Sequence, residues 1–315
     1  MFRTRIIFSA VSVSLLILQT VAARATSYPL TLADDLGVTI TLARRPSRII
    51  SLAPNVTEIL FAIGAGDRVV GVTRYCNYPP EAERLPRVAG YTDVNVERIV
   101  SLSPDLVVAN RGNPRRLLER LSHQGLTVLA IGPRSVEDVV RAISLIGHAT
   151  DAERQAAEVC RDMARTLESV RKAVAGVEHR RRVYFGRLSP PYNTAGPSSF
   201  IGGCIALAGG DNIATGVTQP WLVMSVETIL AGDPEIIIEG FHAADEGVRH
   251  RERLVERLRD DRVWSRVTAV RTGRVYTLDE DRVHRPGPRI ARAVAEMARL
   301  FYPERFAPNG PAKPR

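Results

Sequence analysis

A segment in the first half of the chain recurs in the second half with the same order of residue types. Residues 96–110, VERIVSLSPDLVVAN, match residues 226–240, VETILAGDPEIIIEG. In each copy a glutamate, Glu97 or Glu227, stands seven residues before a proline, which an acid and an apolar run follow. A helix that leads through a short loop into a buried strand is typical of α/β units with parallel strands. The repeat therefore predicts an α/β fold with two Rossmann-like lobes, each built on a parallel sheet.

A second repeated segment shows where the two halves differ. Residues 64–72, GAGDRVVGV, resemble residues 208–217, AGGDNIATGV, at a larger spacing than the first pair. The first half therefore holds about fifteen extra residues, which fall within residues 74–90, RYCNYPPEAERLPRVAG. Loops at the ends of parallel strands form the ligand sites of α/β proteins. We expect this loop to present Tyr75 and Tyr78 to a ligand; the alternative is that they pack on their own lobe.

The N-terminus has the layout of a secretory signal. Arg3 and Arg5 precede an apolar run, and the small residues Ala23 and Ala25 follow it. We expect residues 1–25 to be a signal peptide cleaved near Ala25, which would leave the mature chain outside the cytoplasm. The alternative, a retained membrane anchor, is disfavoured because the apolar run is shorter than the ~20 residues that span a bilayer core. No cysteine follows the small residues to carry a lipid.

A long amphipathic segment separates the two halves. Thr150 and Glu153 can form a capping box, and apolar residues then recur at helical spacing up to Gly176. A helix of this length is long enough to run along both lobes. The predicted divisions are an N-terminal lobe at 26–149, a linking helix at 150–178, a C-terminal lobe at 179–303 and a flexible tail at 304–315.

Charge and motifs exclude several classes of protein. The formal net charge is +9, but the arginines alternate with acids, as in residues 249–262, which is typical of a solvated helix face rather than a nucleic-acid site. A secreted hydrolase is the rival class, yet the chain has no Gly-x-Ser-x-Gly and no HExxH. His242 follows a predicted strand and is the one histidine placed to reach a cleft, although an exposed loop position is the simpler interpretation. No Walker motif is present, so ATP hydrolysis would need a separate subunit.

These segments, read in order from RIISLAPNVTEILFAIGAGDRVVGV to PWLVMSVETILAGDPEIII, resemble the periplasmic binding proteins of ABC importers for iron complexes and cobalamin. The resemblance extends from about residue 48 to 302. Within this family, the segments look most like the cobalamin-binding members. It implies two lobes joined by one long backbone helix, with a ligand cleft between them. It also implies a monomer that is not an enzyme, that has no intrinsic cofactor, and that works with two membrane-spanning permease subunits and separate ATPase subunits.

The resemblance also implies which residues bind the ligand. In cobalamin-binding relatives, aromatic residues of both lobes enclose the corrin, and polar groups of the second lobe contact its edge. Tyr91 and Trp221 each stand six residues before a repeat glutamate, so the pseudo-symmetry predicts that both face the cleft. At Tyr91 and Asn110 the relatives have tryptophan, so this chain has a more polar first-lobe wall. The positions that match are Tyr75, Tyr91, Asn110, Tyr192, Trp221, Asp281 and Arg285.

Two other metal chelates remain open. Haem-binding members use a tyrosine as iron ligand, and Tyr75 or Tyr78 would supply the hard oxygen donor that ferric iron prefers. Siderophore-binding members place arginines in the cleft. Four arginines stand in suitable segments of this chain: Arg74, Arg111, Arg187 and Arg285. Cys76 either touches a metal centre or fills the core as a small apolar side chain.

The repeat glutamates have an implied role of their own. In relatives, the glutamates that match Glu97 and Glu227 dock onto arginines of the two permease subunits, one on each. The alternative is that each carboxylate only complements the positive end of its helix.

Overall fold

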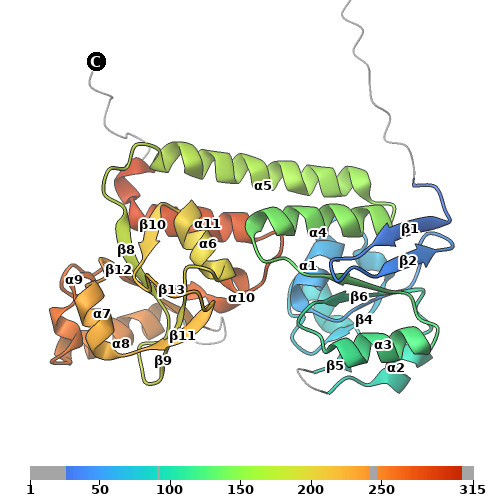
Figure 1. Ribbon diagram of the computed structural model, residues 1–315, viewed down its shortest axis with the longest axis horizontal. Helices are drawn as coiled ribbons and strands as arrows, with labels where there is room; N and C mark the ends of the chain where they lie inside the picture. Colours follow the sequence, from blue (N-terminus) through green and yellow to red (C-terminus); the bar gives the residue numbers. More distant parts are fainter. Residues whose placement is uncertain (1–25, 91–92, 242–246, 307–315) are drawn as a thin grey trace, which may run out of the picture.

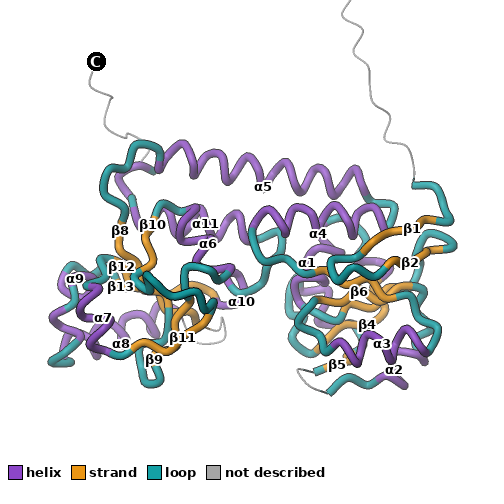
Figure 2. Tube along the Cα trace, viewed as in Figure 1, coloured by secondary structure: helices purple, strands orange, loops and turns teal. Residues whose placement is uncertain are grey.

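The computed structural model describes residues 26–90, 93–241 and 247–306. It has two α/β lobes side by side, with helix α5 (Glu153–Val174) running across both (Figure 1). Figure 2 shows that in each lobe the strands form a central sheet with helices around it. The architecture therefore confirms the two Rossmann-like lobes and the linking helix that the sequence predicts. Among the residues described, no helix is both long enough and apolar enough to span a bilayer.

The N-terminal lobe is built on a parallel five-stranded sheet in the order β5-β4-β3-β6-β7. A small antiparallel hairpin of β1 and β2 precedes it. The strands are β1 (Leu30–Ala33), β2 (Thr39–Leu42), β3 (Ile49–Ser51), β4 (Val69–Thr73), β5 (Arg87–Ala89), β6 (Leu106–Asn110) and β7 (Val128–Ile131). The helices are α1 (Pro54–Ala62), α2 (Val96–Ser101), α3 (Arg115–His123) and α4 (Val136–Ala149), with 3-10 turns at Gly66–Arg68 and Pro80–Arg84.

The C-terminal lobe has a parallel four-stranded sheet in the order β10-β8-β12-β13, and an antiparallel pair of β9 and β11 beside it. The strands are β8 (Arg181–Phe185), β9 (Tyr192–Ala195), β10 (Gly210–Asn212), β11 (Trp221–Met224), β12 (Ile236–Phe241) and β13 (Val275–Asp279). The helices are α6 (Phe200–Leu207), α7 (Val226–Gly232), α8 (Gly247–Asp260), α9 (Thr268–Arg271), α10 (Glu280–Val283) and α11 (Ile290–Phe301), with 3-10 turns at Trp264–Arg266 and Pro303–Arg305.

The sequence repeat corresponds to equivalent elements of the two lobes. Helix α2 leads into β6 and helix α7 leads into β12. Strand β6 pairs with β3, and strand β12 pairs with β8 in the same parallel manner. The helices also start alike, because the Asn95 side chain accepts a hydrogen bond from the Arg98 amide and the Ser225 side chain accepts one from the Thr228 amide. Glu97 and Glu227 thus occupy the same first-turn position.

The extra segment of the first lobe is only partly a loop. Residues 87–89 form β5, which adds an edge strand beside β4, and residues 80–84 form a 3-10 turn. The part left to face a ligand is residues 74–80, which we call the tyrosine loop. The sequence prediction of one continuous ligand loop was therefore too broad, because the segment also extends the sheet.

The linking helix begins later than predicted. Thr150 ends α4, where its hydroxyl donates to the Ile146 carbonyl at 2.7 Å, and α5 starts after Ala152 without a side-chain cap. Asp151 makes the turn between the helices with a positive φ of 53°. Along α5, Ala156, Met163 and Val170 are buried on one face and belong to a core that continues into both lobes.

The C-terminal end also differs from the expected boundary at residue 304. Pro303–Arg305 forms a short 3-10 helix, and Phe306 packs against the core. Residues 304–306 therefore belong to the folded lobe. Residues 1–25 and 307–315, which include the expected signal peptide and most of the expected tail, lie outside the described residues.

Candidate functional site

The C-terminal lobe has a hollow of about 530 Å³ at the carboxyl ends of β8, β12 and β13. This is the edge where open parallel sheets bind their ligands, because the loops that follow the strands converge there. The hollow is lined by Phe185, Gly186, Arg187, Ser189, Asn193, Trp221, Glu239, Gly240, His250, Glu280 and His284.

Trp221 forms a flat wall of this hollow together with His284. The two rings are stacked, with centroids 5.7 Å apart and planes inclined by 17°. Because side chains alternate along β11, Leu222 and Met224 pack inward, whereas Trp221 and Val223 remain 51% and 61% exposed. An exposed tryptophan held by a stacked partner offers a large, rigid apolar face. The structure therefore places Trp221 on the lining of this hollow, and its contact with a ligand stays a prediction.

The rest of the hollow is polar and contains two carboxylates. The Glu239 carboxylate accepts from the Leu188 amide at 3.1 Å and lies 3.2 Å from His250 Nε2. Glu280 and Arg187 complete the charged lining. His284 Nδ1 lies 3.2 Å from the Glu280 carbonyl oxygen, which can only accept, so Nδ1 carries the proton. The lining thus has more carboxylate than guanidinium charge among its described residues.

Tyr192 does not line the hollow. Its ring makes an edge contact with Trp264, with centroids 5.8 Å apart, and it packs on the second core of the lobe. The next residue along β9, Asn193, is the one that faces the hollow. The resemblance implied a ligand contact for Tyr192, but its neighbour Asn193 faces the hollow, because side chains alternate along strand β9.

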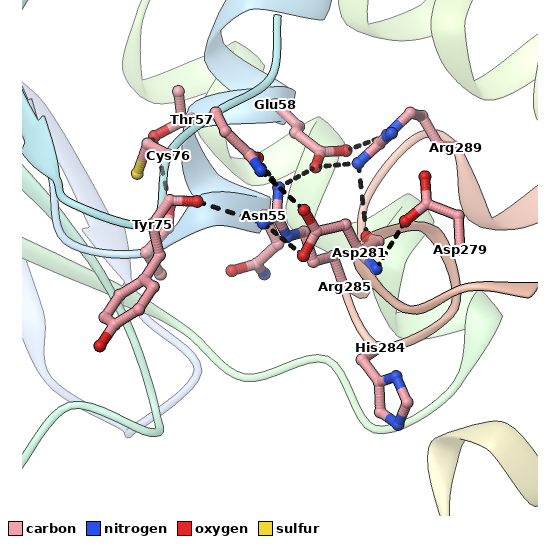
Figure 3. A network of polar contacts seen from close by, with 12 residues as sticks. Asn55, Thr57, Glu58, Tyr75, Cys76, Asp279, Asp281, His284, Arg285 and Arg289 are labelled. Carbon is pink, nitrogen blue, oxygen red and sulfur yellow. Dashed lines mark hydrogen bonds and ion pairs between the residues drawn. The ribbon is translucent and has the colours of Figure 1, made fainter. Parts of the chain in front are cut away.

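The tyrosine loop turns its three central side chains in different directions. Tyr75 is 46% exposed, and Figure 3 shows its ring projecting on the same side as that of His284 in the other lobe. Tyr78 instead lies under Arg289, whose guanidinium carbon is 4.0 Å from the ring centroid. Cys76 is fully buried, within 3.1 Å of the hydroxyls of Thr57 and Thr73. Tyr75 is thus the more exposed of the two tyrosine rings, its contact with a ligand stays a prediction, and Cys76 fills the core.

Asn110 stands at the carboxyl end of β6, as the alignment of the repeat requires. Its amide nitrogen donates to the Asn55 side chain at 3.0 Å, and its side-chain oxygen accepts from the Gly112 amide at 3.0 Å. Asn55 in turn donates to the Pro286 carbonyl of the other lobe at 3.4 Å. Asn110 therefore supports the loop at this strand end and the contact between the lobes.

Asp281 and Arg285 lie where the two lobes meet, and both are already engaged there. Arg285 donates to the Tyr75 carbonyl at 3.1 Å and to the Asn77 side chain at 2.7 Å, and it pairs with Asp281 at 2.6 Å. Figure 3 shows that the partners come from both lobes. The resemblance implied that these two residues contact the ligand. In the structure their charged groups instead bind other protein groups.

The centre of this junction is a residue that the sequence reading did not select. Glu58, on α1, is buried and accepts two hydrogen bonds from Arg289, at 2.8 and 2.7 Å. Burial alone would lower the pKa of Arg289, but the hydrogen bonds and charge of Glu58 outweigh it and raise that pKa. The signal was present in NVTEILFAIG, because a lone carboxylate in an apolar helix needs a charged partner when the helix is buried.

The remaining predicted residues are spread more widely. Glu97 and Glu227 are both exposed. Glu97 makes a 3.4 Å surface ion pair with Arg120. Hydrogen bonds from the Glu227 backbone amide and from the Ser225 hydroxyl lower the pKa of Glu227. Among the four arginines considered for a siderophore, Arg187 lines the hollow, whereas Arg74 pairs with Asp93 at 2.5 Å. Arg111 lies beside a different hollow of the first lobe. Tyr91 and His242 lie outside the described residues.

Comparison with known proteins agrees with this architecture. The model of the family described as periplasmic binding protein matches residues 49–282. The chain is 34% identical over 286 residues to the ABC transporter substrate-binding lipoprotein YvrC of Bacillus subtilis, covering 89% of this chain and 87% of the relative. It is also 34% identical over 287 residues to a cobalamin-binding protein of Halobacterium salinarum, covering 89% and 76% respectively.

Two solved structures share the fold. The periplasmic vitamin B12 binding protein BtuF of Vibrio cholerae has a TM-score of 0.68 at 30% identity, covering 81% of this chain and 96% of that one. The periplasmic haem-binding protein RhuT of Roseiflexus sp. RS-1 has a TM-score of 0.70 at 25% identity, covering 82% and 98%. The chain therefore belongs to the periplasmic binding protein family, the substrate-binding components of ABC importers.

Proposed function

We propose that this protein captures a corrinoid and delivers it to the permease of an ABC importer. The observation that carries the proposal is the hollow of the C-terminal lobe, where the stacked pair of Trp221 and His284 forms a flat wall beside two carboxylates. A flat aromatic wall suits a large, rigid macrocycle, because it buries much apolar area and few bonds lose their freedom. The names of the similar cobalamin-binding and vitamin B12-binding proteins also support a corrinoid ligand.

The charge of the hollow favours a corrinoid over the other chelates. A corrin carries neutral amide side chains, which can donate hydrogen bonds to Glu239 and Glu280. Haem carries two carboxylates, and many ferric siderophores are anionic, so these ligands would place like charges near those two residues. Like charges brought close to each other disfavour the wrong partner and so give specificity.

Titration of the purified apoprotein tests this choice. Cyanocobalamin, haemin and a ferric siderophore are added separately, and binding is followed by absorbance and calorimetry. We expect saturable binding of cyanocobalamin with one ligand per chain, and clearly weaker binding of the two anionic chelates. Tighter binding of haemin or the siderophore than of cyanocobalamin would contradict the corrinoid proposal and leave the transport class intact.

Haem is the second candidate, and the exposure of Tyr75 is the observation that favours it. Phenolate oxygen is a suitable ligand for ferric haem iron. If haem is bound through Tyr75, Tyr75→Phe should abolish the phenolate-to-iron absorption band, while Tyr78→Phe should leave it unchanged. With a corrinoid, Tyr75→Phe should have a small effect on the dissociation constant and Tyr75→Ala a larger one. If Tyr75→Ala binds every tested ligand as tightly as the parent protein does, Tyr75 does not belong to the site.

The transport role includes features outside the described residues. We propose that the signal peptide is cleaved near Ala25 and that the chain is released into the periplasm as a monomer. The expected partners are two membrane-spanning permease subunits, which Glu97 and Glu227 would contact, and separate ATPase subunits. The protein would bind and release its ligand without changing it.

A further inference from the structure

The junction between the lobes is a closed group of two carboxylates and two guanidinium groups. Glu58 belongs to the N-terminal lobe, and Asp281, Arg285 and Arg289 belong to the C-terminal lobe. Arg289 donates two hydrogen bonds to Glu58, and Arg285 lies 3.3 Å from Glu58 and 2.6 Å from Asp281. The charge of Asp279, which accepts from the Asp281 amide, also acts on Arg289. The side chains of the group are 2%, 23%, 11% and 17% exposed, in the order Glu58, Asp281, Arg285 and Arg289.

The same arginines hold the tyrosine loop of the N-terminal lobe. Arg285 donates to the Tyr75 carbonyl at 3.1 Å and to the Asn77 side chain at 2.7 Å, and the Asn77 amide donates to Asp281 at 2.8 Å. Arg289 covers the ring of Tyr78 at 4.0 Å. Three residues of one short loop are thus held by the opposite lobe. In Figure 3 the Tyr75 ring projects away from this group, so the contacts hold the backbone and leave the ring directed outward.

We infer that Glu58 is a positioning residue for the ligand site: through Arg285 and Arg289 it fixes the separation of the lobes and the conformation of the tyrosine loop before any ligand binds. Among the described residues of the N-terminal lobe, Glu58 is the carboxylate that pairs with both arginines. Without it, Arg289 would lose the acceptor of its two hydrogen bonds and Arg285 would keep only Asp281 as a paired carboxylate, which favours separation of the lobes and the entry of water. The link from this geometry to ligand affinity rests on the proposed function, whereas the effect on the lobes does not.

The physical reason for such a group is preorganisation. A ligand that must order a loop and bring two lobes together loses part of its binding free energy to that ordering. A junction that is closed in the free protein removes this cost, and it also explains how Asp281 and Arg285 can matter for binding while their charges bind protein. Glu58 then affects affinity without touching the ligand.

The first experiment measures the lobes in the absence of ligand. Spin labels are placed at Gln124→Cys and Asp260→Cys, one exposed position on each lobe, in a Cys160→Ser background, because Cys76 and Cys204 are buried. We expect one narrow distance distribution for the parent protein and a broadened or displaced one for Glu58→Gln. An unchanged distribution in a folded Glu58→Gln variant would overturn the inference, whatever ligand the protein binds.

The matched control is Glu296→Gln. Glu296 pairs with Arg282 at 3.0 Å between α10 and α11, so this ion pair lies in the same region but within one lobe. We expect it to leave the distance distribution unchanged. Broadening by Glu296→Gln as large as that by Glu58→Gln would show a general loss of helix packing and overturn the specific role of Glu58.

Ligand affinity and loop exchange test the second half of the inference. Glu58→Gln should weaken cyanocobalamin binding by on the order of tenfold, the size expected when a site must be ordered on binding. Glu58→Asp should recover part of that loss. Altered lobe distances with unchanged affinity would overturn the link to the ligand site.

If Glu58→Gln does not fold, Asn77→Ala replaces it, since Asn77 is exposed. Asn77→Ala should then speed amide hydrogen exchange in residues 74–80. Unchanged exchange would overturn the claim that Arg285 and Asp281 hold the tyrosine loop through Asn77.

Discussion

Reversal of both repeat glutamates, Glu97→Arg with Glu227→Arg, is expected to abolish uptake and binding to the permease while ligand affinity stays unchanged. Both carboxylates are exposed in the first turn of equivalent helices, α2 and α7, one on each lobe. Two separated charges of the same sign on two lobes can fix the orientation of a docked protein as well as attract it. Reversal turns both attractions into repulsions, so the effect should be close to complete.

The change should affect docking and not the fold. Neither glutamate is needed to start its helix, because the Asn95 and Ser225 side chains cap α2 and α7. Glu97 also has a surface pair with Arg120, and such pairs contribute only about 0–1 kcal/mol. We therefore expect the melting temperature to stay within a few degrees of the parent. The measurement is binding of the purified protein to its importer in nanodiscs, with cellular uptake as a second readout.

A control with the same change of charge separates docking from general electrostatics. Glu119→Arg with Glu252→Arg also reverses one exposed glutamate on each lobe, away from the repeated position. It should retain docking, with at most a small change in association rate at low salt. Normal ligand-stimulated uptake by the Glu97 and Glu227 double variant would reduce both residues to the simpler role of complementing the helix dipole.

The second large effect concerns Trp221, which we expect to be the main apolar contact of the ligand. Trp221→Ala should weaken corrinoid binding by on the order of 1–3 kcal/mol, which is about ten- to a hundredfold in the dissociation constant. The lobe should remain folded, because the side chain is 51% exposed and packs on His284 rather than in the core. Calorimetry gives the affinity, and circular dichroism and thermal unfolding report the fold.

Two variants serve as matched controls for Trp221. Val223 is on the same face of β11 and is 61% exposed, but it does not line the hollow, so Val223→Ala should leave binding unchanged. Trp264 is the second tryptophan of the chain and is buried in the core. Trp264→Phe therefore leaves Trp221 as the only tryptophan, and its fluorescence should be quenched on addition of cyanocobalamin. Parent-like affinity of Trp221→Ala would remove the residue from the site.

The corrections share one physical origin. Tyr192 was expected in the site from the resemblance, but it lies on strand β9, where a shift of one residue reverses the direction of a side chain. Thr150 was read as the start of α5, but its hydroxyl instead ends α4. In both cases the residue type suited two positions in the fold. Only the path of the neighbouring backbone decided between them.

The repeat of residues 96–110 at 226–240 was enough to determine two parallel α/β lobes, the equivalence of α2 with α7, and the placement of Glu97 and Glu227. Such patterns are local: apolar periodicity, caps and prolines act within a few residues and can be read along the chain. The tertiary structure alone decided that Glu58 meets Arg285 and Arg289, and that Arg285 holds the tyrosine loop. These partners are more than 200 residues apart, so their pairing follows from how the segment between α10 and α11 lies against α1 and from no pattern in either segment.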